Sequence, residues 1–168
     1  PRRVLIVPRF SLSKAEQDLL LQQWAATGRC SDEGLSIAQL FERQVAQTPE
    51  ALACISEAGA LGYGELNERA NRLAHALRTL GVGPEVKVGV CAERSLELVV
   101  SLLAVLRAGG AYVPIDPAYP RERQELMLAD SRASLLLTQS HLEFSEVGNT
   151  LLLDRPLPEI EVGEESPL

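Results

Sequence analysis

The sequence predicts an α/β fold with a mainly parallel sheet and flanking helices, preceded by a helical linker. In the second half of the chain, short apolar runs alternate with stretches of helical periodicity. These runs are apolar throughout, as expected for parallel strands that are covered on both faces. The 168 residues are 46% hydrophobic and 23% charged, which excludes a disordered chain, a coiled coil and a collagen.

Residues 1–34 are expected to form an appendage to this fold. Val4 to Val7 could form a short strand. Ser13 and Glu16 have the spacing of a capping box, so a helix is expected from there to about Trp24. The small and polar residues 27–34 predict a linker.

The next segment predicts a helix, a strand and a longer helix. Ser36 and Gln39 form a second capping-box pattern, and Thr48-Pro49 ends the helix that follows. Residues 52–55 are expected to form a strand, and residues 57–59 a turn. The long helix spans residues 64–80 and ends at Gly81 as a left-handed cap. We expect its buried stripe to consist of Leu66, Ala70, Leu73, Leu77 and Leu80.

From residue 86 onward the elements alternate. Strands are predicted over residues 86–91, 111–115, 134–138 and 150–153. A buried helix over residues 95–108 ends at Gly109-Gly110, and a second helix starts at Pro120 and reaches about Asp130. The tail from Pro156 is rich in Pro and Glu and is expected to be irregular.

Charge and composition exclude several classes of function. The net charge is −7 and aromatic residues are only 4%, which argues against nucleic-acid binding as a main role. The longest apolar stretch, around Leu96 to Leu106, is shorter than the ~20 residues of a membrane span, so no membrane partner is expected. The scattered Cys30, Cys54 and Cys91 indicate reduced, structural thiols and a cytoplasmic location.

The residues by themselves identify no reaction. There is no Walker loop and no nucleophile elbow, and His75 and His141 have no metal-ligand spacing. Asp116 follows a predicted strand, where open sheets place ligands, but a turn acid before Pro117 is the favoured interpretation over a ligand contact. We therefore predict no catalytic, no cofactor-binding and no metal-ligating residue in this chain.

Two motifs nevertheless resemble those of a known family. The runs Leu61 to Asn67 and Arg69 to Ala74 resemble the first core motif of amino-acid adenylation domains in nonribosomal peptide synthetases. Leu106 to Asp116 resembles the second core motif, and it continues as Pro117 to Pro120 and then Glu122-Arg123, as in the family.

Shorter stretches extend the resemblance over roughly Leu35 to Asp154. Gly81 to Glu85, Glu93 to Ser95 and Thr48 to Ala51 are all similar to the family. Residues 10–24 resemble the linker between a condensation domain and an adenylation domain. The resemblance thus implies two parts: residues 1–34 as the end of an upstream condensation domain with its linker, and residues 35–168 as the amino-terminal part of an adenylation domain, truncated before the phosphate-binding loop.

The resemblance also implies what the parent protein does. Such an enzyme activates an amino acid with ATP and Mg²⁺ to an aminoacyl-AMP and transfers it to the phosphopantetheine of a carrier protein. Implied partners are the upstream condensation domain, the remainder of the adenylation domain, a carrier domain and an MbtH-like protein. This chain alone is expected to be inactive. The alternative is a naturally truncated, non-catalytic remnant that serves as a spacer or docking platform.

Four positions depart from the family pattern. Gly62 stands where Ser or Thr is usual, Arg107 replaces Lys, Lys87 replaces an apolar residue, and Gln124 replaces Leu or Ile. We interpret these changes as drift at tolerant positions, although Gly62 and Lys87 could weaken packing.

Overall fold

The computed structural model describes residues 13–18, 34–142, 144 and 149–156. The chain divides into two units, residues 1–34 and 35–168. In the first unit, the described helix α1 covers Lys14–Asp18, and its predicted capping box is present: the Ser13 N–H donates to Glu16 Oε2 at 2.8 Å, and the Glu16 N–H donates to Ser13 Oγ at 3.3 Å. The predictions for residues 4–7, 19–24 and 27–33 lie outside the described residues.

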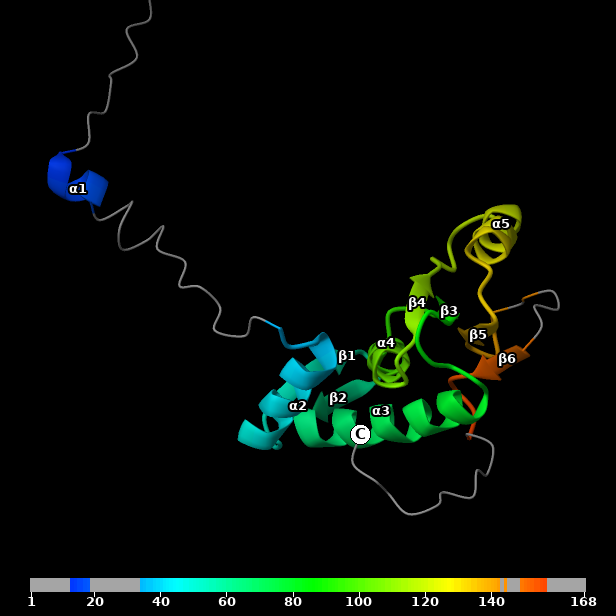
Figure 1. Cartoon of the computed structure of the whole chain (residues 1–168), viewed down its shortest axis with the longest axis horizontal. Coiled ribbons are helices and arrows are strands. Elements are labelled where there is room, and N and C mark those ends of the chain that lie inside the picture. The colour runs from blue at the N-terminus through cyan, green and yellow to red at the C-terminus, as the bar shows by residue number, and fades with distance from the viewer. Residues whose placement is uncertain (1–12, 19–33, 143, 145–148, 157–168) are drawn as a thin grey trace, which may run out of the picture. The chain divides into compact units, whose positions relative to one another are not determined.

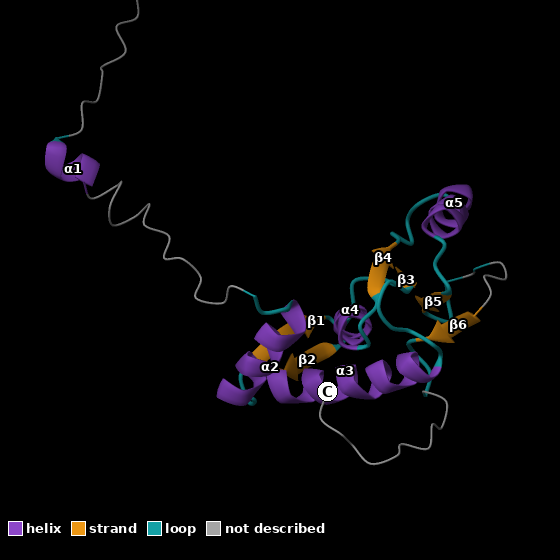
Figure 2. Cartoon of the chain, viewed as in Figure 1, coloured by secondary structure: helices purple, strands orange, loops and turns teal. Residues whose placement is uncertain are grey.

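The second unit begins with a helix and a hairpin. Helix α2 spans Ile37–Gln47, and its capping box between Ser36 and Gln39 is confirmed. Strands β1 (Leu52–Ser56) and β2 (Gly59–Gly62) pair in antiparallel orientation (Figure 2). Strand β2 was not predicted from the sequence, which indicated only a turn before the next helix. The Gly-rich β2 contains few strand-forming residues, and its backbone pairing with β1 defines it.

The remaining elements follow the predicted alternation. In chain order they are α3 (Tyr63–Thr79), β3 (Lys87–Cys91), α4 (Leu96–Arg107), β4 (Ala111–Pro114), α5 (Arg121–Ser131), β5 (Leu135–Thr138) and β6 (Asn149–Leu152). The strand order is β4-β3-β5-β6, and all three neighbouring pairs are parallel. The predicted parallel α/β fold is therefore confirmed.

Helices cover both faces of this sheet, as Figure 1 shows. Val88, Val90 and Leu137 face α3 and α4 within the main core. Cys91 and Leu136 point to the other face, where Leu128 of α5 packs against them. Successive side chains of each strand therefore point into two different cores, one on each face of the sheet. This explains why the strands are apolar throughout.

Leu128 of α5 packs directly over a glycine of the sheet. A Cβ on Gly89 of β3 would lie 2.6 Å from Leu128 Cδ2, well inside van der Waals contact. No feature of the sequence singles out Gly89 for this role. The left-handed cap predicted at Gly81 is present, with φ +86°. Gly109, where the sequence predicted the end of the next helix, also has a positive φ of +87°.

The prediction for one residue of the buried stripe on α3 is wrong. Leu66, Ala70, Leu73 and Leu77 are buried, but Leu80 is 44% exposed. Leu80 is the C-cap residue with φ −82° and ψ 7°, so the chain has already left the helical path there. The helical period therefore no longer predicts the direction of its side chain.

Arg107 does not lie at a tolerant position. It is 6% exposed, and its Nη1 donates to Asn71 Oδ1 of α3. Its Nη2 lies 3.5 Å from Glu42 Oε1 of α2, and its guanidinium carbon lies 5.6 Å from the ring centroid of Phe41. The side chain therefore joins α4 to both α2 and α3. Burial lowers the pKa of the Arg107 guanidinium, and the nearby Glu42 carboxylate opposes that shift.

Gln124 is also buried, with 7% of its surface exposed. Its Nε2 donates to the carbonyl oxygens of Pro117 at 3.0 Å and Tyr119 at 2.8 Å. The Leu or Ile that is usual here has no such donor. Gln124 therefore ties α5 to the loop after β4, and drift at a tolerant position is the wrong interpretation for this residue.

Candidate functional site

The carboxyl edge of the parallel sheet is the part of the fold where a ligand site is expected. From β3 the chain passes through α4 to β4 on one side, and then through α5 to β5 on the other side of β3. The connections that leave β3 and β5, two neighbouring strands, therefore run to opposite sides of the sheet. In open α/β sheets, ligands bind outside the carboxyl ends of the strands at such a switch point.

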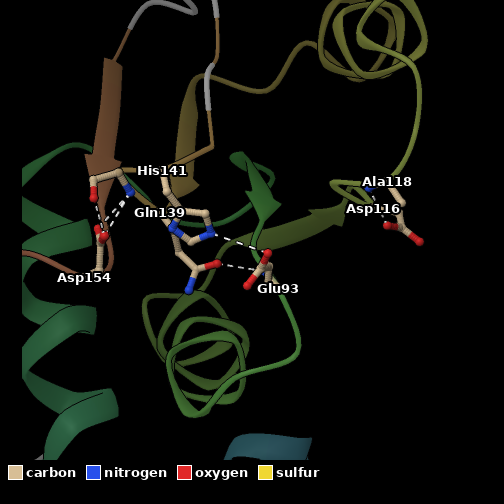
Figure 3. Close-up of polar contacts among 7 residues, drawn as sticks. Glu93, Asp116, Ala118, Gln139, His141 and Asp154 are labelled. Atoms are coloured by element: carbon tan, nitrogen blue, oxygen red, sulfur yellow. Dashed lines mark hydrogen bonds and ion pairs between the residues drawn. The ribbon is translucent and has the colours of Figure 1, made fainter. Parts of the chain in front are cut away.

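Polar residues from the ends of β3 and β5 meet at this point, as Figure 3 shows. The Glu93 backbone N–H donates to Gln139 Oε1 at 2.8 Å, and Gln139 is 7% exposed. The Glu93 carboxylate also lies 3.5 Å from His141 Nε2, with both side chains more than half exposed. Gln139 thus joins the two loops, while the exposed Glu93–His141 pair is weakened by solvent.

A second contact connects β5 to the end of β6. The Ser140 N–H donates to Asp154 Oδ1 at 2.9 Å and to Oδ2 at 3.0 Å, and the Ser140 hydroxyl donates to Oδ2 as well (Figure 3). Hydrogen bonds from the hydroxyl, followed by those from the backbone, hold the pKa of Asp154 below its ordinary value. The charged Asp154 carboxylate therefore connects the segment after β5 to the segment after β6. We call this contact between Ser140 and Asp154 the clasp.

Asp116 follows β4 at the same edge, and its Oδ1 accepts a hydrogen bond of 2.8 Å from the Ala118 N–H (Figure 3). This contact is the turn interaction that the sequence favours for Asp116. Cys91, the last residue of β3, is fully buried. Its burial, and to a smaller extent the nearby Asp116 carboxylate, raises the pKa of the Cys91 thiol to about 11. A thiol with that pKa stays protonated near neutral pH, so Cys91 is not an activated nucleophile.

The other candidate residues do not join this edge. His75 lies half-buried in α3, and Lys87 starts β3 at the amino end of the strand. The hydroxyl of Thr138, the last residue of β5, is buried and has no partner among the described residues. The groups that sequence reasoning missed are Gln139 and the Ser140–Asp154 clasp, since no motif or spacing marks either of them.

The edge does not fit the phosphate chain of a nucleotide. The side chains of Glu93, Asp116 and Asp154 are carboxylates, which repel phosphate oxygens. The side-chain oxygen of Gln139 accepts from the Glu93 N–H, and the Ser140 hydroxyl is bound to Asp154. Within the described parts of the chain, no group of three or more His, Cys, Asp or Glu side chains could hold a metal ion.

No helix among the described residues is long and apolar enough to span a membrane.

Comparison with known proteins agrees with this architecture. The profile of the family described as AMP-binding enzyme matches residues 41–166. A linear gramicidin synthase protein of Brevibacillus parabrevis is 51% identical over 131 residues, which are 78% of this chain and 2% of that protein. Gramicidin S synthase 2 of Brevibacillus brevis is 49% identical over 131 residues, which are 78% of this chain and 3% of that protein.

Solved structures show the same fold. The nonribosomal peptide synthetase FmoA3, in the form bound to α-methyl-L-serine-AMP, is 34% identical with a TM-score of 0.71, over 80% of this chain and 15% of that one. The N-terminal subdomain of Klebsiella oxytoca NpsA shares the fold at 23% identity, with a TM-score of 0.64 over 70% of this chain and 31% of that one.

The sheet topology and the similar structures define the class of protein. The chain is an open, parallel α/β unit like the amino-terminal subdomain of an adenylate-forming enzyme. The chain belongs to the AMP-binding enzyme family and corresponds to the amino-terminal portion of a nonribosomal peptide synthetase adenylation domain. It spans only a small part of the length of the relatives that it matches.

Proposed function

We propose that this chain is the scaffold of an amino-acid adenylation domain and carries none of its catalytic, cofactor-binding or metal-ligating residues. This proposal rests on the hydrogen bonds that side chains make at the carboxyl edge of the sheet. There Gln139, Asp116 and Asp154 all bind backbone groups of neighbouring loops. Side chains used in this way position the loops at the edge of the sheet.

The parent protein, in this proposal, activates an amino acid. The substrate carboxylate attacks the α-phosphorus of ATP, which gives aminoacyl-AMP and releases pyrophosphate. A carrier-protein phosphopantetheine thiol then takes the acyl group and AMP leaves. FmoA3 has also been solved in a form bound to AMPPNP, which supports the use of ATP by this family. Mg²⁺ would neutralise charge on the phosphates.

The proposed partners are those of an assembly line: an upstream condensation domain joined through residues 1–34, the remainder of the adenylation domain, a carrier domain and an MbtH-like protein. Residues 35–168 would form the adenylation part. We place this assembly in the cytoplasm, where ATP is available and where scattered free cysteines stay reduced.

Amino-acid-dependent exchange of pyrophosphate into ATP tests the proposal. The pure 168-residue chain should give no signal above background with any amino acid. A longer chain that adds the rest of the adenylation domain should give exchange with at least one of them. Exchange by the 168-residue chain would refute the scaffold role. No exchange by the longer chain would refute the activity of the parent and favour a non-catalytic platform.

A further inference from the structure

A groove of about 470 Å³ lies between α3, the first turns of α4 and the residues that follow β6. Leu73 of α3 and Val100 of α4 form its base. Both side chains are already buried, at 3% and 9% exposure, so the base offers a ligand little surface. Recognition of a ligand in this groove therefore depends on the groups at its rim.

The rim of the groove is basic, although the chain as a whole has a net charge of −7. Arg69 and Arg72 line it from one turn of α3, and Arg155 lines it from the segment after β6. Among the described residues that line the groove, only Glu97 of α4 is acidic. Positive charges therefore exceed negative ones by two, which favours an anion with two negative charges.

Two of the three arginines have donors without a partner in the described part of the chain. Arg69 pairs with Glu65 at 2.7 Å, whereas Arg72 and Arg155 are exposed and bind no other described residue. Each guanidinium presents five N–H donors in a planar fork and remains charged near neutral pH. Because Arg72 and Arg155 come from separate elements, a ligand that binds both has to offer an oxygen to each.

A phosphate group suits this pair of arginines better than a carboxylate does. A phosphate monoester has up to two negative charges near neutral pH and three acceptor oxygens. A carboxylate has one charge and two oxygens, which a single guanidinium fork can satisfy.

The groove is also larger than a phosphate group alone. Beside Arg155 it is lined by Leu153, which is half-buried, and by Pro156, which is exposed. These two apolar side chains can contact an organic group that is attached to the phosphate.

We propose that the groove between α3 and α4 binds a small organic phosphate monoester. Arg72 and Arg155 donate hydrogen bonds to different oxygens of the phosphate, and Arg69 adds positive potential. Leu153 and Pro156 contact the organic group. The Glu97 carboxylate disfavours ligands that carry a second anionic group. This inference goes beyond the proposed function and does not rest on it, because it involves no step of the adenylation reaction.

Titration of the isotope-labelled 168-residue chain with phenyl phosphate, followed by NMR, tests the proposal. At about pH 7.5, where the monoester is largely a dianion, backbone amide signals of the groove residues should shift and saturate. Arg72→Gln and Arg155→Gln should each weaken binding about twofold to fivefold, as for the loss of one exposed ion pair. Lys87→Gln removes one positive charge from the amino end of β3, outside the groove, and should leave the affinity unchanged.

Further ligands and one conservative variant define the specificity of the groove. Benzenesulfonate has the same ring but one negative charge, and inorganic phosphate lacks the ring, so both should bind more weakly than phenyl phosphate. Arg72→Lys keeps the charge but loses the fork, so its affinity should lie between those of the parent and Arg72→Gln.

Three results would overturn the proposal. Signals that shift without saturating, or an affinity that Lys87→Gln lowers as much as Arg72→Gln does, would indicate non-specific attraction of anions. Equal binding of benzenesulfonate and phenyl phosphate would refute recognition of a phosphate. Equal binding of inorganic phosphate and phenyl phosphate would refute contact with an organic group.

Discussion

Arg107 shows how one side chain can join three helices. Its guanidinium contacts Asn71, Glu42 and Phe41, so it connects α4 to both α2 and α3. In addition, Arg78 Nη2 donates to the Arg107 carbonyl oxygen at 3.0 Å. A planar guanidinium can serve several partners at once, whereas the Lys that is usual here presents a point charge.

We expect Arg107→Ala to lower the free energy of unfolding by about 3 kcal/mol, the lower end of the range for breaking a buried charge pair, because Glu42 is partly exposed. Arg107→Lys should cost less, since it keeps the charge and loses only the fork geometry. Urea unfolding of the three proteins measures both values. An Arg107→Ala variant as stable as the parent would show that the buried charge adds no net stability.

At the scale of the element, the start of α3 lacks a capping side chain. Gly62 is the N-cap residue, with φ −76° and ψ 166°, and makes no side-chain cap bond. The N–H groups of Tyr63 and Gly64 already donate to Ala51 O and Pro49 O. The N–H of Glu65 at position N3 is the one that a serine at position 62 could bind, with Glu65 completing a capping box.

We therefore expect Gly62→Ser to raise the free energy of unfolding by a few tenths of a kcal/mol, and Gly62→Ala to lower it by a similar amount. An added Cβ lies 3.4 Å from the carbonyl oxygens of Pro49 and Ala51, so the two variants share the same steric cost. Thermal unfolding should rank the proteins Ser, Gly, Ala. Equal stability of the Ser and Ala variants would exclude a capping effect.

The clasp between β5 and β6 predicts a dependence on pH. The pKa of Asp154 lies below its ordinary value of 3.8 because Ser140 donates hydrogen bonds to the carboxylate. A lowered folded-state pKa means that the clasp contributes its full stability above the unfolded-state pKa and loses it as the pH falls through the folded-state value. Asp154→Asn lacks this titration.

Urea midpoints measured from about pH 6 down to about pH 3 should therefore fall more steeply for the parent than for Asp154→Asn. The exposed Asp130 at the end of α5, changed to Asn, is a matched control that removes a carboxylate without touching the clasp. If the parent and Asp154→Asn lose stability in parallel across this range, the clasp does not couple to folding.

At the scale of the whole molecule, the sequence correctly predicted the structural features that depend on local residue patterns. Both capping boxes, the parallel sheet and the helix ends at Gly81 and Gly109 follow from residue spacing and glycine geometry. Contacts between distant residues were not predictable in this way. The burial of Arg107, the donors of Gln124 and the bridge from Gln139 to Glu93 each join residues whose proximity only the fold creates.

The order of the sheet also predicts how the chain behaves in solution. The outer strands are β4 and β6, and an outer strand offers its unpaired backbone groups to another sheet. On β4, Tyr112 is 38% exposed, and three of the four residues are exposed. We therefore expect the 168-residue chain to associate as its concentration rises.

A charge on the edge strand should suppress this association, because natural proteins protect edges with lysine. Tyr112→Lys places that charge on β4, and Leu126→Lys makes the same change at a residue of α5 that is 67% exposed and lies off the sheet. Sedimentation velocity should show Tyr112→Lys shifted toward monomer and Leu126→Lys unchanged. Equal shifts would mean that net charge controls association. A monomeric parent with a sharp thermal transition would instead show that the sheet is complete without a further strand, which would favour the docking platform over the scaffold of an enzyme.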